Sequence, residues 1–158
     1  MGFIKIEAVI NESKKFVFEI ESDNLYAITC LAGKNVKFLD RIREICIVDE
    51  IVLIRTEDRD FRNGCQSASF IKDNREENNI YAYDWQGNHL WNIGSIVGDI
   101  KMPFSGISCV FKSMVENEFG IILSDASSTL VICIAGGFIF IVDPINNKML
   151  YKTSGKVR

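Results

Sequence analysis

The stretch NNIYAYDWQGNHLWNIG, residues 78–94, is the part of the chain that decides the fold. An apolar run over residues 80–83 ends at Asp84, a polar turn containing a glycine follows, and Leu90-Trp91 begins a second run. An aspartate side chain can accept hydrogen bonds from turn amides, and glycine tolerates the backbone angles of tight turns. The stretch therefore predicts a β-hairpin, in which Asp84 shapes the turn and Trp91 packs on the sheet.

The same order of features returns twice elsewhere in the chain. Residues 137–155, GFIFIVDPINNKMLYKTSG, place Asp143 after an apolar run and Leu150-Tyr151 after a turn one residue longer. Residues 16–26, FVFEIESDNLY, form a fainter version that ends in Leu25-Tyr26. A large aromatic on each returning strand would dominate the local packing.

This unit resembles the outer hairpin of β-propeller blades, especially the quinoprotein-type (PQQ-like) repeat, at residues 79–94 and 137–155. The second copy departs from the pattern, because Pro144 takes the first turn position and Tyr151 replaces the tryptophan. The resemblance implies a single domain over residues 1–158 with two or three blade-like units, at about 1–40, 45–96 and 105–155. Such a part-propeller is either closed by other elements or completed by association. No cofactor carries over, because quinoprotein cofactor sites draw residues from many blades and none match here.

The rest of the chain also predicts an all-β, mainly antiparallel fold, as blade-like sheets or as an ordinary sandwich or meander. Alternating or β-branched runs predict strands at 3–10, 15–21, 45–56, 129–135 and 138–142. The last two are expected to form a hairpin at Gly136-Gly137 with positive φ at both glycines. We expect one or two short helices, at 35–46 with Asn35 as its cap and at 109–120 with Gly120 as its C-cap, and polar loops at 57–64 and 72–79.

Composition narrows the classes of partner. A net charge of −3 and a pI near 5.2 argue against nucleic-acid binding, which needs a basic surface. The longest apolar run, residues 130–142, is too short to span a membrane and is broken by two glycines. The first residues lack the apolar region of a secretory signal, so we expect a cytoplasmic protein. The five cysteines form no C-x-x-C pair and fit free, mostly buried thiols.

The sequence carries little catalytic or metal-binding chemistry. His89 is the only histidine, which excludes a His-His zinc site, and a Cys65–His89 dyad is much less favoured than a solvated turn histidine. The loop EDRDFRNG, residues 57–64, fails the register of a calcium loop. Asp58, Asp60 and Asn63 could bind a cation weakly there, but a charge-balanced loop is the favoured interpretation, because Arg59 and Arg62 neutralise the acids. We expect no metal and no cofactor.

Two functions of different classes remain. We favour a non-enzymatic protein-interaction module of the cytosol, possible forms being an inhibitor or an immunity-type partner of a more basic protein. Its candidate binding residues are Trp85, His89, Asp58 and Asp60. The alternative is a small hydrolase or ligand-binding enzyme with a site assembled from Asp and Cys side chains. We also expect a homodimer, because a sheet of few strands leaves open edges that must be covered, charged or paired.

Overall fold

The computed structural model describes residues 3–21, 28–76, 78–98, 100 and 102–154. Within them the chain forms three four-stranded antiparallel sheets, each built from strands that follow one another in sequence. The first sheet consists of β1 (Phe3–Val9), β2 (Lys15–Glu21), β3 (Ile28–Leu31) and β4 (Lys34–Asn35). The second consists of β5 (Arg41–Val48), β6 (Ile51–Glu57), β7 (Ile80–Asp84) and β8 (His89–Asn92). The third consists of β9 (Gly106–Phe111), β10 (Thr129–Ala135), β11 (Phe138–Asp143) and β12 (Lys148–Ser154). The all-β prediction is confirmed.

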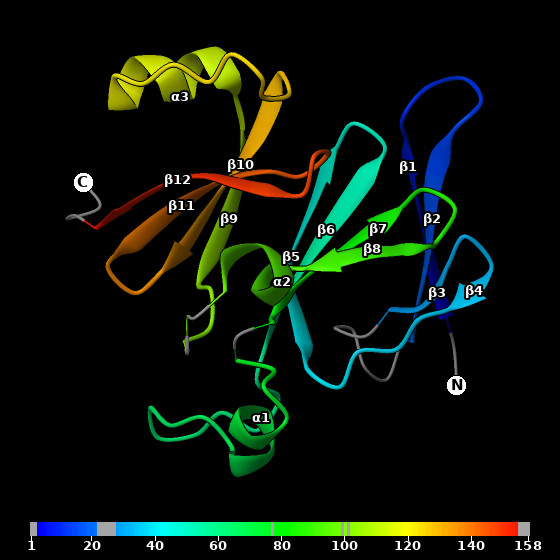
Figure 1. Ribbon diagram of the computed structural model, residues 1–158. Helices are drawn as coiled ribbons and strands as arrows, with labels where there is room; N and C mark the ends of the chain where they lie inside the picture. The colour runs from blue at the N-terminus through cyan, green and yellow to red at the C-terminus, as the bar shows by residue number, and fades with distance from the viewer. Residues whose placement is uncertain (1–2, 22–27, 77, 99, 101, 155–158) are drawn as a thin grey trace.

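The sheets are arranged in series, with the first at the right of Figure 1, the second in the middle and the third at the left. The alternation of side chains along β6 explains this order, because both of its faces are buried. Val52 and Ile54 belong to a core shared with the first sheet, whereas Ile51 and Leu53 belong to a core shared with the third. The second sheet therefore lies between two layers.

The two ends of the series are finished in different ways. The outer face of the third sheet is covered by α3 (Lys112–Phe119), whose Val115 joins Leu130 and Ile141 in a small separate core. The outer face of the first sheet carries an exposed charged group, in which Glu7 pairs with Lys5 and Lys15. Neither end leaves a broad apolar sheet face in the described part of the chain.

Covalent and polar links join the second and third sheets. Cys46 on β5 forms a disulfide with Cys109 on β9, 63 residues away. The fully buried Asn79 donates to the carbonyl oxygens of Thr56 and Phe104 and accepts from the Phe104 amide. Asn79 thereby holds the end of the connection, just before β9, against the second sheet.

The disulfide corrects the expectation of free thiols. Cys46 and Cys109 lie on neighbouring first strands, and their meeting depends on how the sheets pack rather than on local sequence. Cys65 and Cys133 are free, and burial raises the pKa of the Cys133 thiol to about 12. The side chain of Cys30 lies outside the described ones.

The helix predicted at 35–46 is wrong, because residues 41–48 form β5. Exposed and half-buried positions alternate along β5, as expected of a strand, and pairing with the buried β6 decides the outcome. The helix predicted at 109–120 is shorter than expected, since residues 109–111 belong to β9. Gly120, with φ of 65°, ends α3 as its C-cap.

Two further helices were not predicted, namely α1 (Ala68–Lys72) and α2 (Ile93–Val97). Each is a short turn of helix beside a hairpin or loop, too brief to leave a periodic pattern. The hairpin at Gly136-Gly137 is confirmed, although only Gly136 has a positive φ, 58°. No helix in the described residues is both long and apolar enough to pass through a bilayer.

Candidate binding site

Turns from all three sheets meet at one end of the molecule around a depression of about 570 Å³, which we call the turn-end depression. Three isoleucines and three acidic residues line it, namely Ile10, Asp49, Glu50, Ile51, Asp84 and Ile145. Ile10 follows β1 of the first sheet, Asp49 to Ile51 and Asp84 come from the second, and Ile145 comes from the third. The turn-end depression therefore depends on the packing of the three sheets.

Hairpin geometry explains why the acids point outward. Val48 pairs with Ile51, so Asp49 and Glu50 alone make the β5–β6 turn, and Asp49 has a φ of 52°. Aspartate tolerates this left-handed conformation better than most residues. Both acids are exposed while their strand neighbours Val48 and Ile51 are buried.

Asp84 lies at the edge of the depression and also organises its own turn, as predicted. Its carboxylate accepts hydrogen bonds from the amides of Gln86 and Asn88, at 3.0 and 2.8 Å, and from the Asn88 side chain at 3.0 Å. The turn is tied to the first sheet as well, because Lys34 donates to the Asn88 side chain. Asp84, one of the three acids of the turn-end depression, is thus held by a turn that is linked to both the first and the second sheet.

Trp85 is connected to Glu50 of the turn-end depression through Lys14. The Lys14 ammonium lies 5.8 Å from the centre of the Trp85 ring and forms an ion pair with Glu50. A cation over an indole face is attracted by the ring quadrupole. Trp85 also packs against the core between the first and second sheets. Trp85 is therefore half-buried and helps to position Lys14 beside Glu50.

His89 is placed apart from these contacts. Its ring lies 5.3 Å from that of Tyr83, and its Nε2 atom is 2.6 Å from the Asn92 Oδ1 atom. The side chain is exposed at the start of β8. Neither Trp85 nor His89 lines the turn-end depression, but Trp85 is linked to it through Lys14 and Glu50.

Asp58 and Asp60 lie at a second location, the loop that leads into α1. Asp58 is 5% exposed and accepts hydrogen bonds from the Asp60 amide at 3.0 Å, the Ser67 hydroxyl at 2.9 Å and the Ser67 amide. Burial acts to raise the pKa of Asp58, but these donors outweigh it and leave the pKa lowered. Asp58 therefore holds the loop together as a carboxylate, while Asp60 is exposed.

A smaller pocket of about 220 Å³ adjoins Asp58. Three phenylalanines contribute to its walls, and its lining residues are Glu57, Asp58, Phe61, Gln66, Phe70, Pro103, Phe104 and Ser105. Glu57 is paired with Arg43 and Arg55, at 3.2 Å in both cases. Both carboxylates at this pocket are therefore engaged by other protein groups.

The other chemical possibilities are placed as follows. The Cys65 side chain is exposed, and its backbone forms an isolated antiparallel β-bridge with that of Arg62. No described contact joins Cys65 to His89. Within the described residues, no three His, Cys, Asp or Glu side chains are grouped so that they could hold a metal ion.

Of the residues that line the turn-end depression, the sequence predicted a special role only for Asp84, as a turn residue. Asp49 and Glu50 do not stand out in the sequence, because neighbouring residues on a strand would point to opposite faces, yet in the structure these two residues form a turn. The available signal was the order of the hairpins, because alternate turns of an antiparallel meander lie at the same end. Nothing in the local sequence marks Ile10 or Ile145 as a site residue, because only the packing of the sheets brings them to the turn-end depression.

Neither a protein-family model, a curated protein nor a solved structure matches this chain.

Proposed function

We propose that the protein is a non-enzymatic protein-binding module that recognises a more basic partner through the turn-end depression. The observation that carries the proposal is the combination of isoleucines and carboxylates supplied there by turns of all three sheets. The turns are placed on a rigid scaffold, which is the usual arrangement of recognition loops. An inhibitor or an immunity-type protein is the form of this role that we favour.

The lining suggests how a partner would be held. A lysine or arginine side chain has an aliphatic stem that suits Ile10, Ile51 and Ile145 and a cationic head that suits the acids. Asp49 has no cation beside it in the described structure, whereas Glu50 is paired with Lys14. Asp49 is therefore the acid most available to a partner's cation, and Lys14 would have to yield Glu50 for a second contact.

Affinity capture from the native source with Asp49→Lys as the test variant examines this proposal. We expect the wild-type protein to retain a stoichiometric basic partner that Asp49→Lys loses. Asp60→Lys is the matched control, because it makes the same charge change at an exposed acid outside the depression. The purified pair should associate more slowly at higher salt. Recovery of no partner, or equal recovery with both variants, would contradict the proposal.

We propose that this role is exercised in the cytoplasm. The Cys46–Cys109 disulfide weighs against that location, because disulfides persist mainly in oxidising compartments. Alkylation of the protein in intact cells, followed by mass measurement, distinguishes the cytoplasm from an oxidising compartment. Full alkylation of Cys46 and Cys109 would support a cytoplasmic location, and protection of these two cysteines from alkylation would contradict it.

We further propose that the three sheets are blade-like units, at about 1–40, 45–96 and 105–155, in an open series. Each is a meander of four strands in chain order, and β5 and β9, the first strands of two sheets, are neighbours. A crystal structure tests this idea. Blade-like units require one repeated rotation to relate successive sheets, and unrelated rotations would favour an ordinary layered meander.

The small pocket beside Asp58 favours the alternative function, a small hydrolase or ligand-binding enzyme, more than any other part of the described chain does. Its three phenylalanines would suit the apolar part of a small ligand, and Glu57 and Asp58 would have to exchange their present partners to contact it. A fragment screen by NMR tests it, with Phe61→Ala as the variant that opens the wall. Shifts confined to this pocket and lost in Phe61→Ala would support the alternative.

A further inference from the structure

The edge strands of the three sheets differ in how well they are protected against pairing with another strand. Most are short, irregular or covered. β4 has two residues, β8 has four and runs directly into α2, and the pairing of β12 with β11 shifts between Ile141 and Val142. β5 and β9 lie side by side and are joined by the disulfide. These are the devices by which proteins keep sheet edges from pairing.

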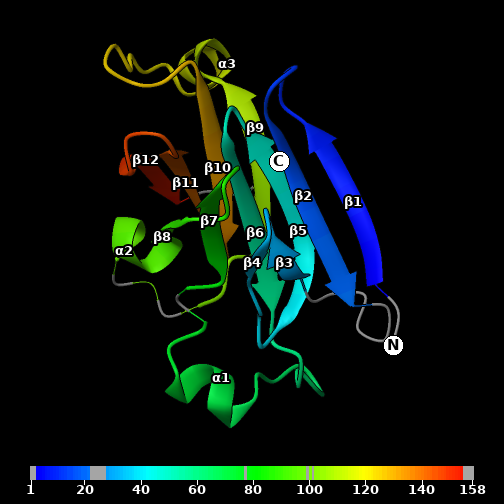
Figure 2. The same ribbon diagram turned by 90° about the vertical axis from the view of Figure 1, so that its right-hand side faces the viewer.

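β1 has none of these protections in the described structure. It is seven residues long, and its pairing with β2 continues without a shift from Phe3 opposite Glu21 to Val9 opposite Lys15. Figure 2 shows it at the outer edge of the molecule, with no other strand on its free side. A long and regular edge with unpaired backbone groups is a template for a further strand.

The side chains of β1 are also unusually exposed for their pattern. Ile4 and Ile6 are 44% and 45% exposed, although Phe16 and Phe18, on the same face of the sheet, are buried. A strand added beside β1 would extend that face and cover the two isoleucines. The apolar core between the first and second sheets would then continue across the new strand.

The sequence of β1 is complementary to itself in one antiparallel register. If two copies pair about a two-fold axis through Ile6, Lys5 lies opposite the partner's Glu7, and Glu7 lies opposite the partner's Lys5. Ile4 then lies opposite the partner's Ala8, and the two Ile6 side chains face each other. Opposite charges directly across from one another stabilise an antiparallel pair, whereas like charges destabilise it.

We propose that two copies of this chain pair through β1 in this register, so that their first sheets form one continuous eight-stranded sheet. The interface is isologous, with the same strand used by both copies. It is separate from the turn-end depression, so each surface can fail its test without affecting the other.

A pair of charge reversals tests the register. Lys5→Glu places two glutamates opposite each other at both ends of the pair, and Glu7→Lys places two lysines there. We expect each variant alone to have a dimer dissociation constant at least about tenfold above that of the wild type. A one-to-one mixture of the two variants makes every cross-strand pair opposite in charge again. We expect that mixture to dimerise within about threefold of the wild type.

Sedimentation equilibrium across a concentration series measures these constants, and far-UV circular dichroism checks that each variant is folded. Met149→Lys is the matched control, because Met149 is 38% exposed on another edge strand and should leave dimerisation unchanged. Ile6→Arg, which places two cations on the two-fold axis, carries the test if either reversal fails to fold. A monomeric wild type would overturn the proposal. So would folded reversal variants whose mixture stays monomeric, or an Ile6→Arg variant that dimerises like the wild type.

Discussion

In the β7–β8 hairpin, Asp84 accepts three hydrogen bonds, all from its own turn, and is partly exposed. In the β11–β12 hairpin, the corresponding Asp143 is fully buried. It accepts from the amides of Ile145 and Asn146 and the Asn146 side chain, and also from the amide and hydroxyl of Ser127, which precedes β10. The second aspartate thus shapes its turn and anchors a distant loop.

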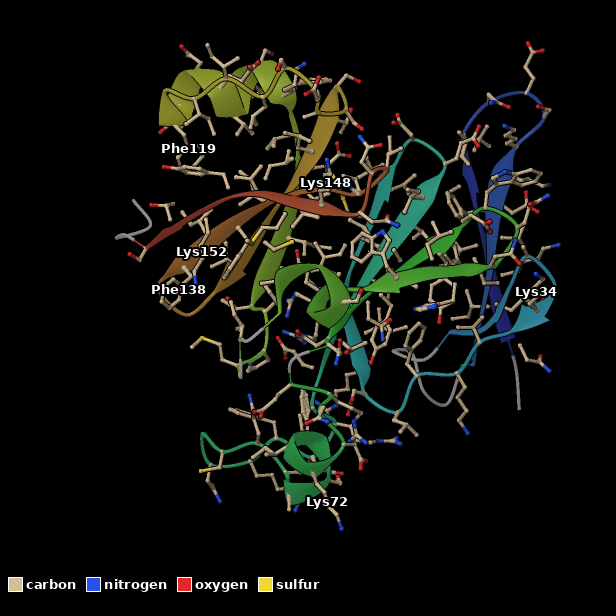
Figure 3. The ribbon with its side chains drawn as sticks, in the orientation of Figure 1. Lys34, Lys72, Phe119, Phe138, Lys148 and Lys152 are labelled. Carbon is tan, nitrogen blue, oxygen red and sulfur yellow. A yellow bond between two sulfur atoms is a disulfide. The ribbon has the colours of Figure 1, made fainter. Side chains whose placement is uncertain are left out.

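The aromatics on the returning strands differ in the same way. Trp91 is 4% exposed and packs toward the third sheet, where its indole N–H donates to the Pro144 carbonyl oxygen at 3.1 Å. Tyr151 is half-buried and packs against Phe119 of α3, with ring centres 5.6 Å apart. Figure 3 shows Phe119 between α3 and the third sheet. One hairpin meets another sheet, and the other meets a helix.

The difference teaches that a similar hairpin can serve at the middle or at the end of a series. Its neighbour decides how much each residue contributes to stability. Where the neighbour is a sheet, the aromatic is locked by burial and a hydrogen bond. Where α3 takes that place, the contact is a smaller aromatic pair.

The largest effect is expected from the aromatic of the middle sheet. Trp91→Ala should lower the free energy of unfolding by about 3–5 kcal/mol, because it empties a buried site between two sheets. Tyr151→Ala should cost about half as much, since its side chain is only half-buried. Urea unfolding of both variants measures the difference. An equal or larger loss for Tyr151→Ala would break the comparison.

Asp143→Asn should lower the free energy of unfolding by about 3 kcal/mol at pH 7, because charged acceptors of several hydrogen bonds are costly to replace. Burial raises the pKa of Asp143, but the Ser127 and Asn146 donors outweigh it and leave the pKa lowered. A lowered pKa contributes stability that is present above the unfolded pKa of about 4 and is lost as the pH falls through the folded value.

The gap between wild type and Asp143→Asn should therefore shrink below about pH 4. Unfolding curves from pH 7 to pH 2 measure it. Asp84→Asn is the control and should cost about 1 kcal/mol, because its partners can turn to water. A gap that stays constant with pH would count against the carboxylate as the stabilising group.

The β7–β8 and β11–β12 turns differ in how much room they leave for a side chain. Gly87 and Asn147 both have positive φ, 81° and 55°. A Cβ atom at Gly87 would lie 2.5 Å from the backbone oxygen of Leu31 in the first sheet. Gly87→Asn should therefore cost about 2 kcal/mol, because backbone must move, while Asn147→Gly should change stability by about 0.5 kcal/mol or less. Thermal unfolding distinguishes them, and equal effects would show that φ alone matters.

The smallest effect concerns the helix that covers the third sheet. Phe119→Leu should cost about 1 kcal/mol, because it keeps apolar contact but loses the aromatic pair with Tyr151. A double-mutant cycle with Tyr151→Leu isolates the pair, and we expect a coupling of about 0.5–1.5 kcal/mol. Coupling near zero would mean that α3 covers the sheet without specific contact.

Most of the β structure was predictable because alternation along a strand is a local signal. The Asp84 turn and the Gly136-Gly137 hairpin were predictable for the same reason, since they depend on side chains within a few residues. The segment at 35–46 misled because Leu39, Ile42 and Cys46 satisfy helical spacing. In the structure Leu39 is 56% exposed, while Ile42 and Cys46 pack against two different cores, so the three residues do not share one buried face.

The candidate site was less predictable than the fold. Trp85 and Asp58 stood out as unusual residues, but their contacts with Lys14 and Ser67 show that they also support local structure. The turn-end depression joins residues from 10 to 145, so only the packing of three sheets brings it into being. The fainter repeat at 16–26 cannot be compared, because residues 22–27 lie outside the described ones.

The disulfide between β5 and β9 also makes the three sheets unequal in how they can come apart. Closing a loop of 63 residues is worth about 4 kcal/mol in the chain-entropy account, and it unites the second and third sheets as one covalent body. The first sheet is held to that body by packing, by the intervening chain and by exposed polar contacts such as Lys14 with Glu50 and Lys34 with Asn88. It is therefore the part best able to detach in a partial opening event. Detachment of the first sheet would expose Val52 and Ile54 on β6 to solvent. The second sheet would then present an apolar surface that promotes aggregation.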